Sequence, residues 1–290
     1  MLDWKIGVIG GSGLYDLEGL EGVEQIALET PWGTPSEVLL SGRLDGVEFV
    51  FLSRHGRGHR LPPSQVPYRA NIDALKRVGC TDILSVSACG SLRDDYAPGD
   101  FVLVDQFIDR TFAREKSFFG PGLVAHVSMA DPVCTRLSAL AGDAARQSGV
   151  TVHARGTYLA MEGPQFSSRA ESHMYRQWGC DVIGMTNMPE AKLAREAELP
   201  YATLAMVTDY DCWREDEAVV EVTNVLEVMA RNTEAARRTL SALANRLKSL
   251  SRTPSPSGIE TCLDHALITA PSARDPACVA KLDAVAGRVL

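Results

Sequence analysis

Apolar residues along this chain gather in short runs that end at glycines or small polar residues. The first run covers residues 5–9 and leads into Gly10-Gly11-Ser12-Gly13, which predicts a buried strand followed by a tight loop. Asp45-Gly46 lies between apolar residues at 38–40 and 47–52, as in a β-hairpin. Further strands are predicted where similar runs recur, at 83–88, 101–104, 157–161, 181–185 and 201–208.

Between these runs, apolar residues recur every three or four positions, as on one face of a helix. Residues 68–78 have this spacing and stop at Gly79, and Asp131-Pro132 predicts the start of a helix that reaches Gln147. Strands that alternate with helices favour an α/β fold, here a single domain with a mostly parallel, mixed central sheet flanked by helices. Other helices are expected from Ser167 or Ser168 to Trp178, at 189–197 and at 222–247.

The pattern changes after residue 250. Arg-Thr-Pro-Ser-Pro-Ser-Gly predicts a linker over 251–258. Apolar spacing returns in 259–290, but that segment is too short to form a core of its own. We therefore expect one domain over 1–250 and a tail, 259–290, that packs on the main domain or on a neighbouring subunit.

Charge and cysteine content exclude several classes of partner. The 290 residues carry a formal net charge of -8, so no nucleic-acid partner is expected, although a small local anion site is compatible with it. No stretch approaches the ~20 apolar residues of a membrane span, and the first residues do not resemble a signal peptide. The seven cysteines include no C-x-x-C pair, which favours reduced thiols in a cytoplasmic protein over disulfides or a zinc site.

Candidate chemistry lies directly after the predicted strands, where ligands collect in open α/β sheets. Several of these residues offer a cation, hydroxyl groups or N–H groups to a tetrahedral oxyanion: Ser12, Arg54, His55, Ser87 and Thr186. Phe166 offers an aromatic face to a heterocycle. Each feature has a structural alternative, because a glycine loop can be a plain turn, Arg54-His55 a surface pair and Phe166 part of the core.

Asp209 and Asp211 follow the last predicted strand. On an extended segment, residues two apart point to the same side, so the two carboxylates are expected to lie together. Burial and a neighbouring carboxylate raise the pKa of an acid, and one of the pair could then donate a proton near neutral pH. The alternative is that the two aspartates simply cap a helix.

As an ordered set, these motifs resemble the trimeric purine-nucleoside phosphorylases, and within them the branch that acts on 5'-methylthioadenosine. The resemblance spans residues 5 to about 248 and implies the fold of that family. The motifs that carry it are IGGSGL at 9–14, SRHGRGH at 53–59, SACGSLR at 87–93, AMEGPQFSSRAES at 160–172, GMTNMPEAKLA at 184–194 and TDYDCW at 208–213.

The resemblance assigns roles to individual residues. It implies that phosphate is held by Ser12, Arg54, His55, Ser87, the N–H of Ala88, and Thr186. It implies that the nucleoside contacts Phe166, Ser167, Met185, Asp209, Asp211, Val222 and Val225, together with His126 from a neighbouring subunit of a homotrimer or a dimer of trimers. Val222 and Val225 also fit the apolar stripe of a helix.

The two aspartates distinguish between purine bases. Relatives that act on guanine or hypoxanthine nucleosides have a neutral amide here, whereas a carboxylate accepts a hydrogen bond from the 6-amino group of adenine. The resemblance therefore implies phosphorolysis of 5'-methylthioadenosine to adenine and a sugar phosphate, as in methionine and purine salvage. Asp209, protonated or sharing a proton with Asp211, would protonate the departing base.

Other functions remain open from the sequence. Within the same class, the alternatives are a broader adenosine phosphorylase and a methylthioinosine phosphorylase. Outside it are a nucleoside hydrolase, an inactive nucleoside-sensing protein and a nicotinamide-dependent oxidoreductase, although the glycine spacing of the last is missing. No metal or organic cofactor is expected, since inorganic phosphate is a co-substrate, and no membrane partner is expected.

Overall fold

The computed structural model describes residues 3–11, 13–15, 17–214 and 222–290, with no side chains described at 222–225. Within these residues one 11-stranded sheet runs through the molecule in the order β2-β3-β4-β1-β5-β10-β9-β7, and β11, β6 and β8 continue from β5 on another path. The strands are β1 (Lys5–Gly10), β2 (Glu21–Ile26), β3 (Leu39–Leu44), β4 (Val47–Ser53), β5 (Asp82–Ser91), β6 (Phe101–Leu103), β7 (Gln106–Asp109), β8 (Val152–His153), β9 (Thr157–Ala160), β10 (Val182–Gly184) and β11 (Tyr201–Asp209).

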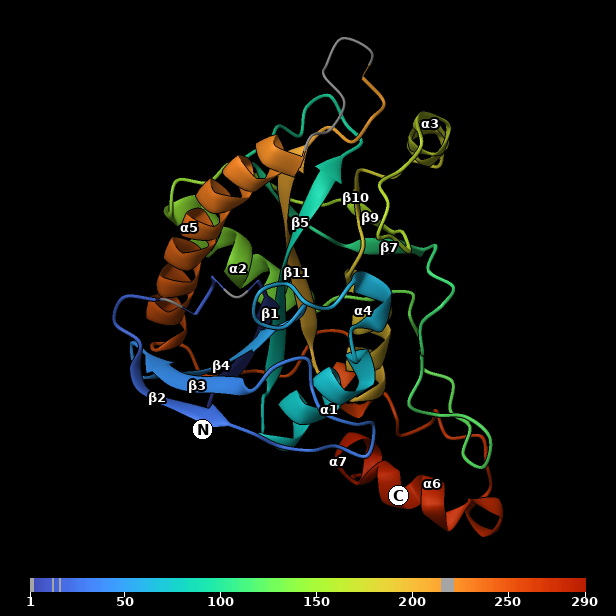
Figure 1. Cartoon of the computed structure of the whole chain (residues 1–290). Helices are drawn as coiled ribbons and strands as arrows, with labels where there is room; N and C mark the ends of the chain where they lie inside the picture. The colour runs from blue at the N-terminus through green and yellow to red at the C-terminus, as the bar shows by residue number, and fades with distance from the viewer. Residues whose placement is uncertain (1–2, 12, 16, 215–221) are drawn as a thin grey trace.

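Helices cover both faces of the sheet (Figure 1). α2 and α5 pack against each other and against β11, while α1 and α4 pack together and α4 contacts β5 and β11. The predicted α/β fold, with a mixed sheet flanked by helices, is confirmed. The helices are α1 (Tyr68–Arg77), α2 (Thr135–Gln147), α3 (Arg169–Gln177), α4 (Asn187–Glu196), α5 (Val222–Leu247), α6 (Pro276–Lys281) and α7 (Asp283–Ala286).

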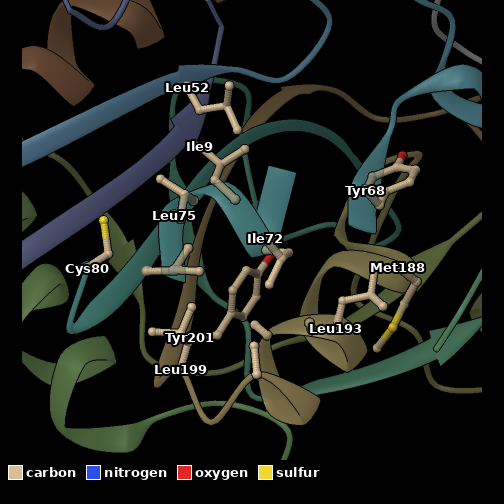
Figure 2. Close-up of a cluster of buried hydrophobic side chains, with 14 of the residues drawn as sticks. Ile9, Leu52, Tyr68, Ile72, Leu75, Cys80, Met188, Leu193, Leu199 and Tyr201 are labelled. Atoms are coloured by element: carbon tan, nitrogen blue, oxygen red, sulfur yellow. The ribbon is translucent and has the colours of Figure 1, made fainter. Parts of the chain in front are cut away.

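The central strands have no exposed face, because alternate side chains enter different cores. On β4, Phe49 and Phe51 join the cluster that packs with α2 and α5, whereas Val50 and Leu52 join the cluster that packs with α1 and α4. Figure 2 shows the second cluster, where Leu52 lies near Ile9 and the α1 side chains. This two-sided burial explains why these strands are nearly continuous apolar runs.

The structure corrects several predicted elements. β2 was not predicted, because its residues are almost all exposed and carry no apolar alternation. The helix expected at Asp131-Pro132 begins only at Thr135, with Cys134 as the N-cap. The Asp45-Gly46 hairpin is confirmed: both residues have positive φ, 51° and 82°, and they join β3 to β4.

The segment after residue 250 folds back on the body of the same chain. Arg252 forms an ion pair with the buried Asp82, and Leu263 is fully buried in the cluster around α1 and α4. Residues 266–269 also pair with the loop before α2: the His126 N–H donates to Ala266 O at 2.9 Å, and Ala125 bridges Leu267. The tail therefore fixes the position of the segment that bears His126.

Candidate active site

A break in the pairing of β5 creates the central feature of the site. On one side, β5 pairs with β1 through residues 82–85 and with β10 only at 90–91. Residues 86–89 between them pair with neither strand, so their main-chain groups on that side are available to other partners. Ser87 and Ala88, both expected to contact phosphate, lie within this break.

Arg54 lies at the edge of the break, directly after β4. It is 2% exposed, and its Nε and Nη2 donate to the two carboxylate oxygens of Glu190 at 2.8 and 3.0 Å. Nη2 also donates to Ser85 Oγ at 2.7 Å, while Nη1 makes one long bond, 3.4 Å, to Val86 O. The interpretation of Arg54 as a surface residue is therefore wrong. Nη1 is the atom with donor capacity left for an anion.

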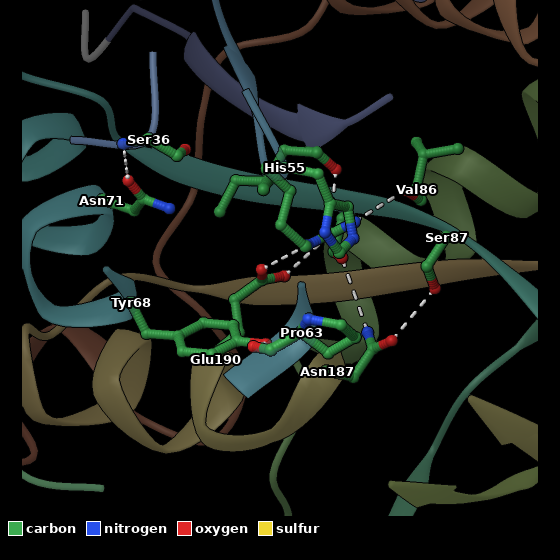
Figure 3. A network of polar contacts seen from close by, with 12 residues as sticks. Ser36, His55, Pro63, Tyr68, Asn71, Val86, Ser87, Asn187 and Glu190 are labelled. Carbon is green, nitrogen blue, oxygen red and sulfur yellow. Dashed lines mark hydrogen bonds and ion pairs between the residues drawn. The ribbon is translucent and has the colours of Figure 1, made fainter. Parts of the chain in front are cut away.

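Asn187 on α4 donates through Nδ2 to Ser85 Oγ at 3.4 Å, the same hydroxyl oxygen that accepts from Arg54 Nη2. Figure 3 shows Asn187 beside Ser87. The Ser87 hydroxyl donates to Asn187 Oδ1 at 3.0 Å, and Asn187 Nδ2 donates to Thr203 Oγ1 at 2.7 Å. Thr186 precedes α4 and is 7% exposed, and its side chain does not cap that helix. The structure thus brings Arg54, Ser87 and Thr186 together around the start of α4.

His55 follows Arg54 and is partly buried. Its Nδ1 lies 2.8 Å from Leu61 O, and because a carbonyl oxygen can only accept, Nδ1 carries the proton. Burial, with the adjacent Arg54 charge, lowers the pKa of His55 to about 4, so the ring is neutral at neutral pH. Nε2 is then an acceptor, ready for a group that brings its own proton.

Asp209 ends β11 at the other end of the break, beside Gly90. Thr208 Oγ1 donates to Asp209 Oδ2 at 2.6 Å, and the Asp211 N–H donates to Oδ1 at 2.8 Å. A Cβ on Gly90 would lie 2.9 Å from Asp209 Oδ1, so a side chain at this position would displace the carboxylate. Burial raises the pKa of Asp209 in spite of the two hydrogen bonds.

Asp211 does not adopt the extended geometry expected from the sequence. Its φ is 52°, in the left-handed region that Asp tolerates, so the chain turns after Asp209 and the alternation argument fails here. Asp211 Oδ2 is buried without a hydrogen-bond partner among the described residues, and burial raises its pKa. The two residues are adjacent because the Asp209 carboxylate accepts from the Asp211 main chain, not because of a shared strand face.

The loops after β9 and β10 complete this end of the site. Cys212 Sγ donates to Ser167 O at 3.2 Å, which brings Ser167 to the aspartates. Met185 lies against the loop at Gly163, where an added Cβ would be 2.5 Å from Met185 Sδ. Phe166 is 52% exposed, so the alternative of a core residue is wrong.

Four predicted site residues are not brought into this arrangement by the described contacts. His126 is exposed and bonds through its main chain to the tail. Ser12 lies outside the described residues, and so do the side chains of Val222 and Val225 on α5. Among the described residues, no group of three or more His, Cys, Asp or Glu side chains could hold a metal ion, and none of their helices is long and apolar enough to cross a bilayer.

Sequence reasoning missed Glu190, Asn187 and Gly90. Glu190 and Asn187 occur within GMTNMPEAKLA, and polar residues at the start of a predicted helix directly after a buried strand were the available signal. Gly90 follows Cys89 in a strand, where an isolated glycine often marks a close approach of another group.

The chain belongs to the phosphorylase superfamily, whose sequence profile it matches over residues 5–245. The family predicted from the motifs is thereby confirmed. Its relatives include a Cereibacter sphaeroides protein called S-methyl-5'-thioadenosine phosphorylase, 63% identical over 98% of this chain and 98% of the relative. A Rhodospirillum rubrum protein of the same name is 59% identical over 98% and 97%.

Solved structures agree with this relationship. A methylthioadenosine phosphorylase from an antarctic soil metagenomic library superposes with a TM-score of 0.92 at 46% identity, covering 98% of this chain and 99% of that one. Methylthioadenosine phosphorylase from Schistosoma mansoni in complex with adenine gives a TM-score of 0.85 at 38% identity, with 94% and 99% covered.

Proposed function

We propose that the protein catalyses the phosphorolysis of 5'-methylthioadenosine to adenine and 5-methylthioribose 1-phosphate. The observation that carries the proposal is the position of two unlike groups at the two ends of one break in β5. At one end, Arg54 Nη1 offers a donor to an anion, and the Ser87 hydroxyl can turn its proton from Asn187 Oδ1 to the same anion. At the other end, Asp209 beside Gly90 offers an acid. Ser87 and Gly90 are three positions apart on the strand, about 10 Å, which is enough for a ribose between a phosphate and a base.

The anion end suits phosphate, and we assign its binding to Arg54, His55, Ser87, the Ala88 N–H and Thr186, with Ser12 expected from the sequence. Glu190 neutralises most of the Arg54 charge and fixes the guanidinium, so that Nη1 is held in one orientation. His55 Nε2 can accept the P–OH proton of hydrogen phosphate.

The base end suits adenine, which Asp209, Asp211 and Ser167 would contact while Met185 and Phe166 border the ribose and base. Asp209, whose pKa is raised by burial, gives a proton to N7 as the bond from N9 to C1' breaks, and the bonding electrons leave with the base. A phosphate oxygen forms the new bond to C1' from the opposite face and stabilises the cationic sugar as it develops. The phosphate itself is the nucleophile, so the step needs no covalent enzyme intermediate.

The proposal extends to the assembly and location of the protein. We infer a trimer or dimer of trimers in which His126 enters a neighbouring site, supported by the exposure of His126 on a segment fixed by the tail. We infer a cytoplasmic location from the seven cysteines, all described and all free thiols.

One set of assays tests this function. Adenine or hypoxanthine release is measured with methylthioadenosine, adenosine and inosine, each with and without phosphate. The proposal expects release from methylthioadenosine that depends on phosphate. Equal release without phosphate would indicate a hydrolase, preference for adenosine would indicate the broader enzyme, and no release from any nucleoside would leave a binding protein.

A further inference from the structure

Arg114 lies in the long loop between β7 and α2, and neither the sequence motifs nor the proposed chemistry assign a role to it. Its side chain is 0% exposed, which is rare for arginine unless its donors are paired. Its guanidinium stands 5.5 Å from the centre of the Tyr68 ring.

The guanidinium of Arg114 bonds mainly to main-chain carbonyls. Nη1 donates to Met185 O at 2.6 Å and to Met188 O at 2.7 Å, which lie on either side of the start of α4. Nη2 donates to Glu162 O at 2.6 Å and to Met161 O at 3.3 Å, directly after β9. Nε donates to Glu162 Oε1 at 3.2 Å, so the single carboxylate partner belongs to the same loop.

These acceptors lie on two loops with different tasks in the proposed reaction. The turn from Met185 to Met188 contains Thr186, at the anion end, and Met185, at the ribose. The loop at Met161 and Glu162 leads to Ser167 at the base end, and Ser167 Oγ lies 3.7 Å from Met161 Sδ. One side chain thus connects the loops that would contact all three parts of the nucleoside and phosphate pair.

Glu162 fixes Arg114 in turn. Its Oε2 accepts from the N–H groups of Phe112 and Ala113, at 2.5 and 3.2 Å, immediately before Arg114. The loop and the guanidinium are therefore held from the same point, and the Arg114 side chain has little freedom to follow a shift of either loop. A planar group with five fixed donors suits this task better than the single ammonium of lysine.

We propose that Arg114 is a positioning residue that sets the distance between the Met185–Met188 turn and the Met161–Glu162 loop, and thereby aligns nucleoside and phosphate. The inference rests on the proposed function. Arg114 acts without contact with substrate, so its loss changes substrate affinity and alignment rather than the chemistry of proton transfer.

The test compares Arg114→Ala, Arg114→Lys and the exposed control Arg110→Ala in steady-state phosphorolysis, with rates divided by the concentration of folded protein. Misplacement of the two loops is expected to lower kcat/KM of Arg114→Ala by about 10- to 100-fold, with raised KM for both nucleoside and phosphate. Arg114→Lys should fall in between, because one ammonium can bond to some of the carbonyls but not to both loops in the same geometry. Arg110→Ala should match the wild type.

A purely structural role would reduce the amount of folded protein and leave both KM values unchanged, and that result would overturn the proposal. If Arg114→Ala does not fold, the KM values of Arg114→Lys serve as the test, since this variant keeps the buried charge. Wild-type KM values for Arg114→Lys would then overturn the proposal. The wild-type assay separates this inference from the proposed function: absence of phosphate-dependent adenine release in the wild type refutes the function itself.

Discussion

Asp209 is the residue whose protonation matters most in the proposed reaction. Asp209→Asn keeps the shape but removes the acid, so turnover should fall by ~10²-fold or more. Because burial raises the pKa of Asp209, the acid form persists to higher pH than for an ordinary carboxyl group, and wild-type kcat should decline as pH rises through that pKa.

Measured kcat against pH checks both statements. The Asn variant should be slow and should lack the alkaline decline. A variant with wild-type turnover at every pH would assign the proton donor to another group, with Asp211, whose Oδ2 is buried and unbonded among the described residues, as the next to replace.

Glu190 is the counterion that makes a buried Arg54 tolerable. Glu190→Gln leaves the guanidinium without a compensating charge at 2% exposure, which should lower the free energy of unfolding by about 3–5 kcal/mol. Phosphate should stabilise this variant against urea more than it stabilises the wild type, because the anion supplies the missing charge.

The measurement is urea unfolding with and without phosphate, and Glu115→Gln is the control because the Glu115 side chain is 76% exposed. Equal stability of the Glu190 variant and the wild type would contradict the importance of the pair. No difference in the phosphate effect would argue against Arg54 as a phosphate contact.

At this scale the sequence predicts where side chains emerge but not what they meet. Arg54 was expected after an apolar strand because strand ends can be read from local composition. Its partner Glu190 lies 136 residues away and has no local mark that separates it from any helical glutamate. Asp211 is a further case, because nothing in the local sequence distinguishes an aspartate with positive φ from one in an extended segment.

At the scale of elements, α4 has residues of the candidate site at its start and an acid with a raised pKa, Glu196, at its end. Glu196 accepts from Ser117 Oγ and from the Phe118 N–H, both at 2.7 Å, and so anchors the loop before α2. Burial raises the pKa of Glu196 to about 7. Between pH ~4.5 and ~7 the folded protein therefore retains a proton that the unfolded chain has lost.

The contribution of Glu196 to stability should consequently fall as pH rises through that window, by up to about 3 kcal/mol. Glu196→Gln mimics the neutral form, so it should flatten this slope and be more stable than the wild type above pH 7. Urea unfolding at pH 5 and pH 8 measures the difference. If the stability of the wild type and of Glu196→Gln changed by the same amount between pH 5 and pH 8, this role of Glu196 would be excluded.

Elements differ in how far they can be predicted. The hairpin at Asp45-Gly46 and the buried strands follow from local patterns that few other structures satisfy. β2 could not be predicted, because its exposed residues are held by main-chain pairing to β3, and such pairing does not require a pattern of apolar and polar side chains. The start of α2 is displaced from Asp131-Pro132, because the cap preference is weak against the packing of the preceding loop.

At the scale of the whole molecule, the tail contributes both core and pairing. Leu263 is fully buried, so Leu263→Ala should lower the free energy of unfolding by about 2–5 kcal/mol. It should also speed hydrogen exchange at the His126 amide, which donates to Ala266 O only while the tail is docked.

Leu250→Ala is the matched control, since that leucine is 42% exposed. Exchange followed by mass spectrometry reports the segment directly. Unchanged protection at His126 in a destabilised Leu263→Ala protein would mean that the loop holds its shape without the tail.

The break in the pairing of β5 has a consequence for how such a protein can change its substrates. Ser87 and Gly90 lie on the same strand, so the distance between the anion and the base is fixed by the rise per residue of that strand. Inserting one residue would not lengthen that gap gradually, since it would also turn every later side chain to the opposite face. New substrate specificity can therefore arise through changes in the surrounding loops, but not through changes in the distance between Ser87 and Gly90.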